Sequence, residues 1–398
     1  MPTKGKASRG EPRSESRPIP GSDAFTDLRK TNHVQSQAAT LLLIGSHQRG
    51  DLPAIQARAQ AVKGSRLAPA QTTLQRDLEA LGFPRMQVGP VRFRSLELQR
   101  ALGVRFMAAP AARPTPKDVQ TASRNLRQAA NKFYRDANSE TAAALLEAGL
   151  RHPHQLVRVA AAAAYFDLAA EPQRATGVLE EGLNSRDLLT RDVAAYALAH
   201  IDPKNPKLSS LLISRAKRSA RKRSHTSLIV HGTWARSSPW WQPPNGDFWK
   251  YLHDNVDPSL YGAGDRFEWS GGYSDAARAL AGNDLHNWVQ QHSLDGLDLF
   301  THSQGGNVAM LANQAGTTVG RMVLLSCPVH WPKYSPDFNK AGKVVSIRVH
   351  LDLVILADRG GQHFQDGRIH ENVLPIWFDH FATHDPGVWQ KHNVPSML

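Results

Sequence analysis

The chain has 398 residues, a net charge of +13, 41% hydrophobic residues and a single cysteine, Cys327. This length exceeds that of one typical domain, the composition is that of a globular protein, and a lone cysteine excludes an internal disulfide. The longest apolar runs fall far short of the ~18 residues that a membrane-spanning helix needs.

The N-terminal region has a basic, low-hydrophobicity start. Residues 1–30 are rich in Pro, Gly, Ser, Lys and Arg, which predicts a disordered basic tail. No apolar segment follows early enough to form an ordinary secretory signal. We therefore expect a cytoplasmic protein, or one exported by a route without such a signal. Residues 31–110 show only weak patterns and form a region of unknown fold, followed by a Pro- and Ala-rich linker.

Charge and tryptophan content both change near residue 220. Residues 1–224 carry 36 Lys and Arg against 19 Asp and Glu, whereas residues 225–398 carry 12 against 16. All nine tryptophans lie between Trp234 and Trp389. Because two independent properties change at the same place, we expect a domain boundary there.

Residues 117–212 are Ala-rich and predict stacked helices. Leu150 and Arg158 recur 33 residues later as Leu183 and Arg191. Each unit reads as a helix that ends near glycine, a short polar turn and an Ala-rich helix, which resembles a HEAT repeat. An ordinary Ala-rich helical bundle is the alternative. A helical repeat region of this kind would offer a docking surface for a protein partner.

A basic segment, 213–225, separates these helices from the rest of the chain. Six of the eleven residues from Ser214 to Ser224 are Lys or Arg. We interpret it as a solvated linker. Attraction to an anionic surface, such as acidic lipid headgroups, is the alternative. No nucleic-acid module accompanies the segment, so no specific nucleic-acid partner is expected.

Residues 226–398 alternate between strand and helix patterns, which predicts βαβ units and a parallel sheet. Ser227–Val230 is a short apolar run typical of a central strand, and it ends in His231-Gly232. Phe267–Gly272 reads as another strand end. His231 is interpreted as a structural residue of its turn.

Ser303 lies between a strand pattern and a small-residue helix pattern. The stretch Leu297–Met310 reads as strand, abrupt turn and helix, with the serine at the turn. This is the context of a nucleophile elbow, Gly-x-Ser-x-Gly, although Thr301 stands where the first glycine would be and Gly305 supplies the last. The alternative is an ordinary turn with Ser303 as a helix cap.

A serine nucleophile needs a base and a carboxylate that orients the base. Asp352 directly follows the strand pattern that ends at His350, so we favour it over Asp358. His384 lies in a polar loop before a helix start and is the predicted base. His380, which has aromatic neighbours on both sides, is interpreted as packed.

Residues 226–395 resemble an α/β-hydrolase of the lipase and esterase type. The resemblance rests on the His-Gly turn, the elbow, the strand-end Asp and the terminal His-x-Pro-x-Val-Trp segment. It implies hydrolysis of carboxylic esters through an acyl-enzyme, without metal or organic cofactor. By this resemblance Ser303 attacks, His384 shuttles the proton, Asp352 orients His384, and the amides of Thr233 and Gln304 hold the oxyanion.

The predicted architecture is therefore multidomain, with an all-α HEAT-like region followed by an α/β-hydrolase domain that has a mostly parallel central sheet. The predicted function is a serine ester hydrolase acting on an ester or lipid substrate. Two alternatives are a HEAT-like scaffold with a degenerate hydrolase domain, and a phospholipase effector directed to membranes by its basic half.

Overall fold

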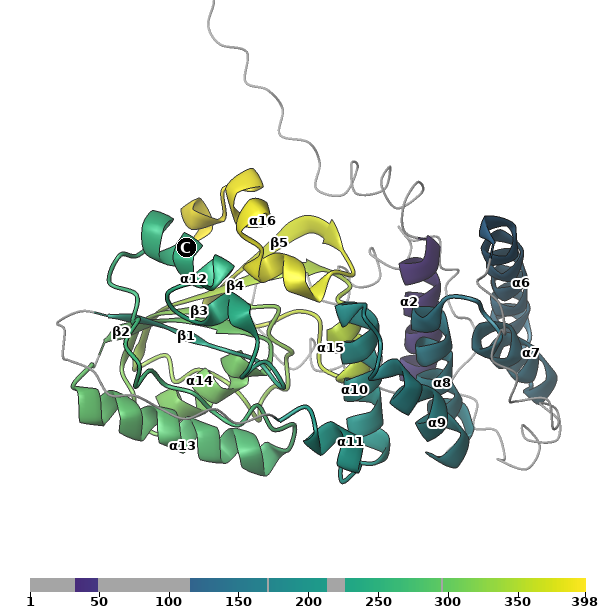
Figure 1. Cartoon of the computed structure of the whole chain (residues 1–398), viewed down its shortest axis with the longest axis horizontal. Coiled ribbons are helices and arrows are strands. Elements are labelled where there is room, and N and C mark those ends of the chain that lie inside the picture. The colour runs from purple at the N-terminus through teal and green to yellow at the C-terminus, as the bar shows by residue number, and fades with distance from the viewer. Residues whose placement is uncertain (1–32, 49–114, 170–171, 213–225, 295) are drawn as a thin grey trace, which may run out of the picture.

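The computed structural model describes residues 33–48, 115–169, 172–212, 226–294 and 296–398. The predicted tail at 1–30, most of region 31–110 and the linker 213–225 lie outside the described residues. Within them, a helix-rich N-terminal part precedes a C-terminal part with five parallel strands in one sheet (Figure 1). The predicted order, helices first and a parallel sheet second, is confirmed.

The helical part begins with α2, which lies in the region 31–110 to which the sequence assigns no fold. Its helices are α2 (His33–Gln48), α6 (Pro116–Arg135), α7 (Ser139–Leu150), α8 (Gln155–Ala169), α9 (Pro172–Gly182), α10 (Leu188–Ile201) and α11 (Pro206–Ser209). Side-chain caps start several of them: Thr115 and Asp118 form a capping box on α6, and Asp187 caps α10. Helix α8 packs between α2, α7, α9 and α10.

The 33-residue repeat has a direct counterpart in the packing. A Cβ added at Gly149 would lie 2.7 Å from the Cβ of Ala161, and one added at Gly182 would lie 2.7 Å from the Cβ of Ala194. Because no side chain stands between them, α7 approaches α8 and α9 approaches α10 at equivalent positions of the two units.

The sheet has the strand order β1-β2-β3-β4-β5, and every neighbouring pair is parallel. Its strands are β1 (Ser227–Val230), β2 (Leu297–His302), β3 (Val319–Leu325), β4 (Ala341–His350) and β5 (Ile369–Trp377). The carboxyl ends of parallel strands meet at one edge, so the residues that follow each strand come together there. Phe267–Gly272 forms no strand, which corrects the prediction for that stretch.

Helices cover both faces of the sheet. Residues of α13 (Asp275–His292) and α14 (Gln304–Gln314) share one apolar core with one face. Residues of α12 (Asp247–Asn255) and α16 (Pro386–Lys391) share another core with the opposite face. The 3₁₀ turns η1 (Pro239–Trp241), η2 (His380–His384) and η3 (Val394–Met397) complete this part.

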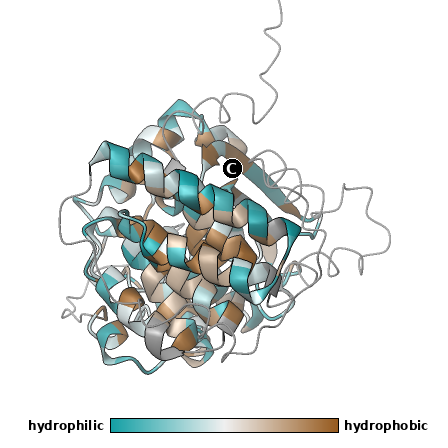
Figure 2. Ribbon diagram, turned by 90° about the vertical axis from the view of Figure 1, so that its right-hand side faces the viewer, coloured by the Kyte–Doolittle hydropathy of each residue, from teal (hydrophilic) through white to brown (hydrophobic). Residues whose placement is uncertain are grey.

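The helical part and the sheet part are joined by a common apolar core. This core runs through the helices from α2 to α10 and continues into Leu351, Trp377, Phe378 and α15 (Leu353–Ala357), which follows β4. Figure 2 looks onto the helical end of the molecule and shows hydrophobic positions gathered in its middle. None of the described helices is both long and apolar enough to cross a membrane.

Candidate functional site

Ser303 occupies a strained turn between β2 and α14. Its backbone has φ 54° and ψ −131°, a conformation that non-glycine residues rarely adopt. The N–H of Ser303 donates to the carbonyl of Leu325 at 2.9 Å, which ties the turn to the end of β3. A Cβ at Gly305 would lie 2.4 Å from the carbonyl oxygen of Val230, so only glycine fits there.

Thr301, which stands where the elbow motif has glycine, has a defined partner. Its side chain is buried, and its hydroxyl donates to the carbonyl oxygen of Val323 in β3 at 2.9 Å. The side chain thus points toward the neighbouring strand, and the strain of the turn lies at Ser303 itself.

Asp352 and His380 form a buried ion pair at the carboxyl edge of the sheet. Asp352 Oδ2 lies 2.7 Å from His380 Nδ1, and both side chains are only 2% exposed. The other oxygen, Oδ1, accepts hydrogen bonds from the N–H groups of Val354 and Ile355 and so caps α15. The carboxylate is therefore fixed by the helix start, and it fixes the imidazole in turn.

The charge on Asp352 also sets the acid–base behaviour of His380. Burial disfavours the imidazolium, but the nearby carboxylates of Asp352 and, on α10, Asp192 favour it. The pKa of His380 is therefore raised above its ordinary value. An imidazole of this kind readily accepts a proton near neutral pH.

Two observations place the Asp352–His380 pair near Ser303. His302, the residue before Ser303, has its Nε2 3.3 Å from the carbonyl oxygen of His380, and the two rings are 4.7 Å apart. Asp192 interacts electrostatically with His380, and Tyr196, one turn further along α10, contacts Ser303. Ser303 and His380 therefore both lie near α10.

His384, the predicted base, is not paired with Asp352. Its ring stacks on Trp240 with centroids 4.1 Å apart, and its Nε2 is buried without a hydrogen-bond partner. Burial lowers the pKa of His384 to about 3. The expected pairing is therefore corrected: His380 holds the ion pair, and His384 is the packed ring. With Trp240 and Phe248, His384 lines a cavity of about 190 Å³.

The two predicted oxyanion residues both belong to segments next to Ser303. Gln304 is the first residue of α14, where backbone N–H groups have no partner within the helix. Thr233 follows Gly232, whose added Cβ would lie 2.9 Å from the Cβ of Ser303. The turn after β1 therefore abuts the serine. Burial lowers the pKa of His231 to about 4, as expected of a structural residue in that turn.

Asp358, the alternative acid, forms a second carboxylate–histidine pair. Its Oδ2 accepts from the side chain of Gln304 at 2.9 Å and lies 2.8 Å from His330 Nε2. Asp358 is buried, whereas the His330 side chain is 25% exposed. Asp358 therefore holds the residue after Ser303, while Asp352 holds a fully buried imidazole.

Sequence reasoning missed Tyr196, which comes from α10 of the helical part. Its hydroxyl lies 3.1 Å from Ser303 Oγ. The Tyr196 ring is buried edge-on against Trp234 and Tyr273, with centroids 4.9 and 5.4 Å apart. A signal was present in the repeat: 33 residues earlier, the position equivalent to Tyr196 is Ala163.

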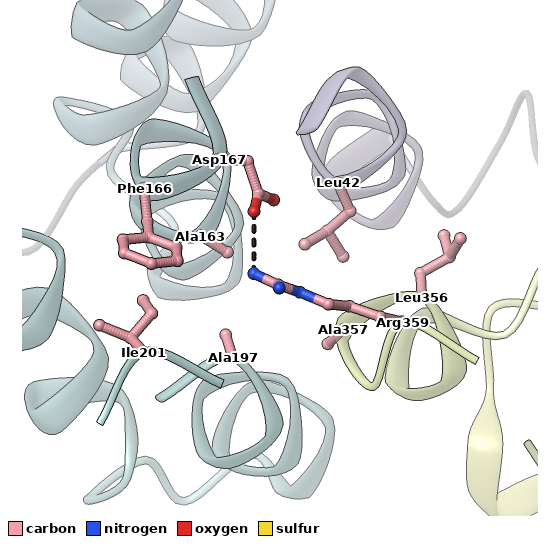
Figure 3. A pocket seen from close by; sticks show the side chains of 9 residues that line it. All are labelled: Leu42, Ala163, Phe166, Asp167, Ala197, Ile201, Leu356, Ala357 and Arg359. Carbon is pink, nitrogen blue, oxygen red and sulfur yellow. Dashed lines mark hydrogen bonds and ion pairs between the residues drawn. The ribbon is translucent and has the colours of Figure 1, made fainter. Parts of the chain in front are cut away.

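The helical part also clamps the segment that carries Asp352. Arg359, just after α15, pairs with Asp167 of α8 at 3.0 Å. Figure 3 shows this ion pair beside a small cavity between α2, α8, α10 and α15. The described residues contain no group of three His, Cys, Asp or Glu side chains arranged to hold a metal ion.

No family model matches the chain, and no curated protein matches it. Among solved structures, it is similar to the 2.75 Å crystal structure of an uncharacterized protein from Bacillus cereus ATCC 10987. The two are 13% identical, the match covers 69% of this chain and 97% of that chain, and the TM-score is 0.29. A likeness this low carries no argument, so function must be inferred from the geometry of the site.

Proposed function

We propose that the protein is a serine hydrolase that cleaves carboxylic esters. The observation that carries the proposal is the strained Ser303 turn beside the buried Asp352–His380 pair, at the carboxyl edge of a parallel sheet. A nucleophile, a base and an orienting carboxylate are the three groups that acyl transfer needs. We accordingly interpret residues 226–398 as an α/β-hydrolase domain and the helical part as HEAT-like.

In this proposal His380 takes the role first given to His384. Ser303 Oγ attacks the ester carbonyl while His380 Nε2 accepts its proton, since His380 Nδ1 is held by Asp352. The N–H groups of Thr233 and Gln304 stabilise the oxyanion. Collapse of the intermediate expels the alcohol, which takes the proton from His380, and water then releases the acid by the same steps.

The resemblance to lipases favours an apolar acyl chain. The cavity beside His384 supports this preference, because the rings of Trp240, Phe248 and Phe381 line part of it and offer apolar surface next to η2, the turn that carries His380. A series of esters with increasing acyl length tests this preference. A hydrolysis rate that does not depend on acyl length would refute the idea that the cavity binds the acyl chain.

Labelling with a fluorophosphonate probe tests the activity itself. The wild-type protein should be labelled, and Ser303→Ala should not. Ser326→Ala is a matched control, because Ser326 is also a buried serine with positive φ at the end of a strand, β3. A folded wild-type protein that takes no label would reject the hydrolase and favour a non-catalytic scaffold.

A further inference from the structure

We propose that Tyr196, carried by the helical part, is a catalytic residue that donates a hydrogen bond to the oxyanion formed at the ester carbonyl. The inference rests on the proposed hydrolase and adds a group that the resemblance does not imply. Its basis is the contact of 3.1 Å between the Tyr196 hydroxyl and Ser303 Oγ. In the tetrahedral intermediate the oxyanion and Ser303 Oγ are bonded to the same carbon. A donor that reaches one oxygen therefore reaches the other after a small rotation.

The surroundings of Tyr196 place its hydroxyl on the oxyanion side of Ser303. Its ring packs edge-on against Trp234, which directly follows the proposed oxyanion residue Thr233. Asp192, one turn earlier on α10, is close enough to His380 for its carboxylate to raise the pKa of that imidazole. Either hydroxyl can donate in the Tyr196–Ser303 contact of the free protein; once the serine proton has gone to His380, the tyrosine is left as the donor.

Tyr196 is suited to donate rather than to act as a base. Burial raises the pKa of the Tyr196 hydroxyl, and the charge of Asp358 raises it further, while interactions with Ser303 and Thr233 act in the opposite direction. The hydroxyl therefore stays protonated at neutral pH. A buried, neutral hydroxyl held by packed rings is a preorganised donor for developing negative charge.

The repeat supplies independent support from the sequence. On α10 of the second unit, Tyr196 contacts Ser303, and Asp192 contributes to the raised pKa of His380. The equivalent positions of the first unit, 33 residues earlier, are Val159 and Ala163, both buried in the helical core. Polar groups thus replace apolar ones on the helix that contacts Ser303.

The proposed step keeps atoms and electrons in balance. As Ser303 Oγ bonds to the carbonyl carbon, the π electrons of the carbonyl move to its oxygen, and the serine proton goes to His380. Tyr196 keeps its own proton and shares it in a hydrogen bond. When the carbonyl re-forms, the C–O bond to the alcohol breaks, and the alcohol leaves with the proton from His380.

The Tyr196→Phe variant tests the inference, with kcat and KM measured on a p-nitrophenyl ester. Loss of one oxyanion donor should lower kcat by about 10²–10³-fold with little change in KM, because the bond strengthens only in the transition state. Tyr165→Phe, which removes a buried tyrosine hydroxyl from α8, is the matched control and should keep kcat. Unchanged or increased kcat in Tyr196→Phe would overturn the inference. It would indicate that the Tyr196 hydroxyl only occupies Ser303 Oγ in the free protein.

Two further measurements separate this role from simple packing. A trifluoromethyl ketone, whose serine adduct carries an oxyanion, should bind Tyr196→Phe more weakly by the factor lost in kcat/KM. If the phenylalanine variant does not fold, a fluorinated tyrosine at 196 keeps the ring and has a more acidic hydroxyl. On the alkaline side of the pH profile, kcat of this variant should begin to decline at a lower pH than kcat of the wild type. An unshifted profile would refute the role of Tyr196 as a donor. If the fluorophosphonate probe does not label Ser303 in the wild type, the proposed hydrolase itself is rejected. That result is distinct from a failure of the Tyr196 inference alone.

Discussion

The Asp352→Asn variant gives the sharpest test of the acid–base pair, because the α15 cap determines which way the new amide points. Asp352 Oδ1 accepts from two backbone N–H groups at 2.9 and 3.1 Å, so the asparagine oxygen should stay there. Its NH₂ group then faces His380 Nδ1 in place of Oδ2. His380 must accept at Nδ1 and carry its proton on Nε2, the atom that should receive the serine proton.

The expected loss is large because both tautomer and charge are wrong. Locking a triad histidine in the wrong tautomer lowers kcat by about 10⁴-fold, or about 5.5 kcal/mol of transition-state stabilisation. If the amide turned the other way, its NH₂ group would face the two backbone N–H groups at the start of α15. Both cap hydrogen bonds would be lost, which would lower the free energy of unfolding by about 1 kcal/mol. Steady-state hydrolysis of a p-nitrophenyl ester, with thermal unfolding as a check on the fold, measures both.

Asp358→Asn is the matched control, since it makes the same change in the other buried aspartate of the site. Asp358 pairs with His330 and Gln304 rather than His380, so the loss in kcat should stay within about tenfold. If Asp352→Asn kept a tenth or more of wild-type activity while Asp358→Asn lost a thousandfold, Asp358 would be the orienting acid and the assignment would be refuted.

The pH dependence follows from His380: kcat/KM should rise with pH through a midpoint above about 6.5, because the neutral imidazole is the base and its pKa is raised. A midpoint well below 6.5 would contradict the pairing. His384→Gln should keep fluorophosphonate labelling within about tenfold of wild type while His380→Gln loses it, and the reverse result would restore His384 as the base. Gly305→Ala should lower the free energy of unfolding by about 3 kcal/mol, because its Cβ would lie 2.4 Å from the carbonyl oxygen of Val230. Gly177→Ala, in open space on α9, should raise it by about 0.5–1 kcal/mol, and urea titrations measure both.

Features with local signals were predictable from the sequence. The Ser303 turn is encoded by a strand pattern that meets a small-residue helix pattern, and its backbone strain follows from that junction. Asp352 was identified because it comes just after an apolar run, and β4 does end at His350. The sequence favours Asp352 over Asp358 but does not decide between them, because the choice depends on which imidazole each carboxylate contacts.

The base was harder to identify than the acid, because a histidine with apolar neighbours in the sequence can be either a packed ring or a buried catalytic imidazole. His380 lies near Phe378 and Phe381, and aromatic neighbours suggested a packed ring. A catalytic imidazole also needs apolar surroundings, which strengthen its ion pair with a carboxylate. The two histidines are one short 3₁₀ turn apart, and only the orientation of η2 directs His380 to Asp352 and His384 to Trp240.

Tyr196 shows what local reasoning cannot supply, because 107 residues separate it from Ser303. Sequence reasoning treated the helical part as a separate docking domain. In the structure its core continues into α15, its Asp167 holds Arg359, and its Tyr196 contacts Ser303. Removing the helices would expose the apolar face of α15, and with it the helix start that fixes Asp352. We therefore expect the sheet part without the helical part to lose both stability and activity, which makes the two parts one functional unit.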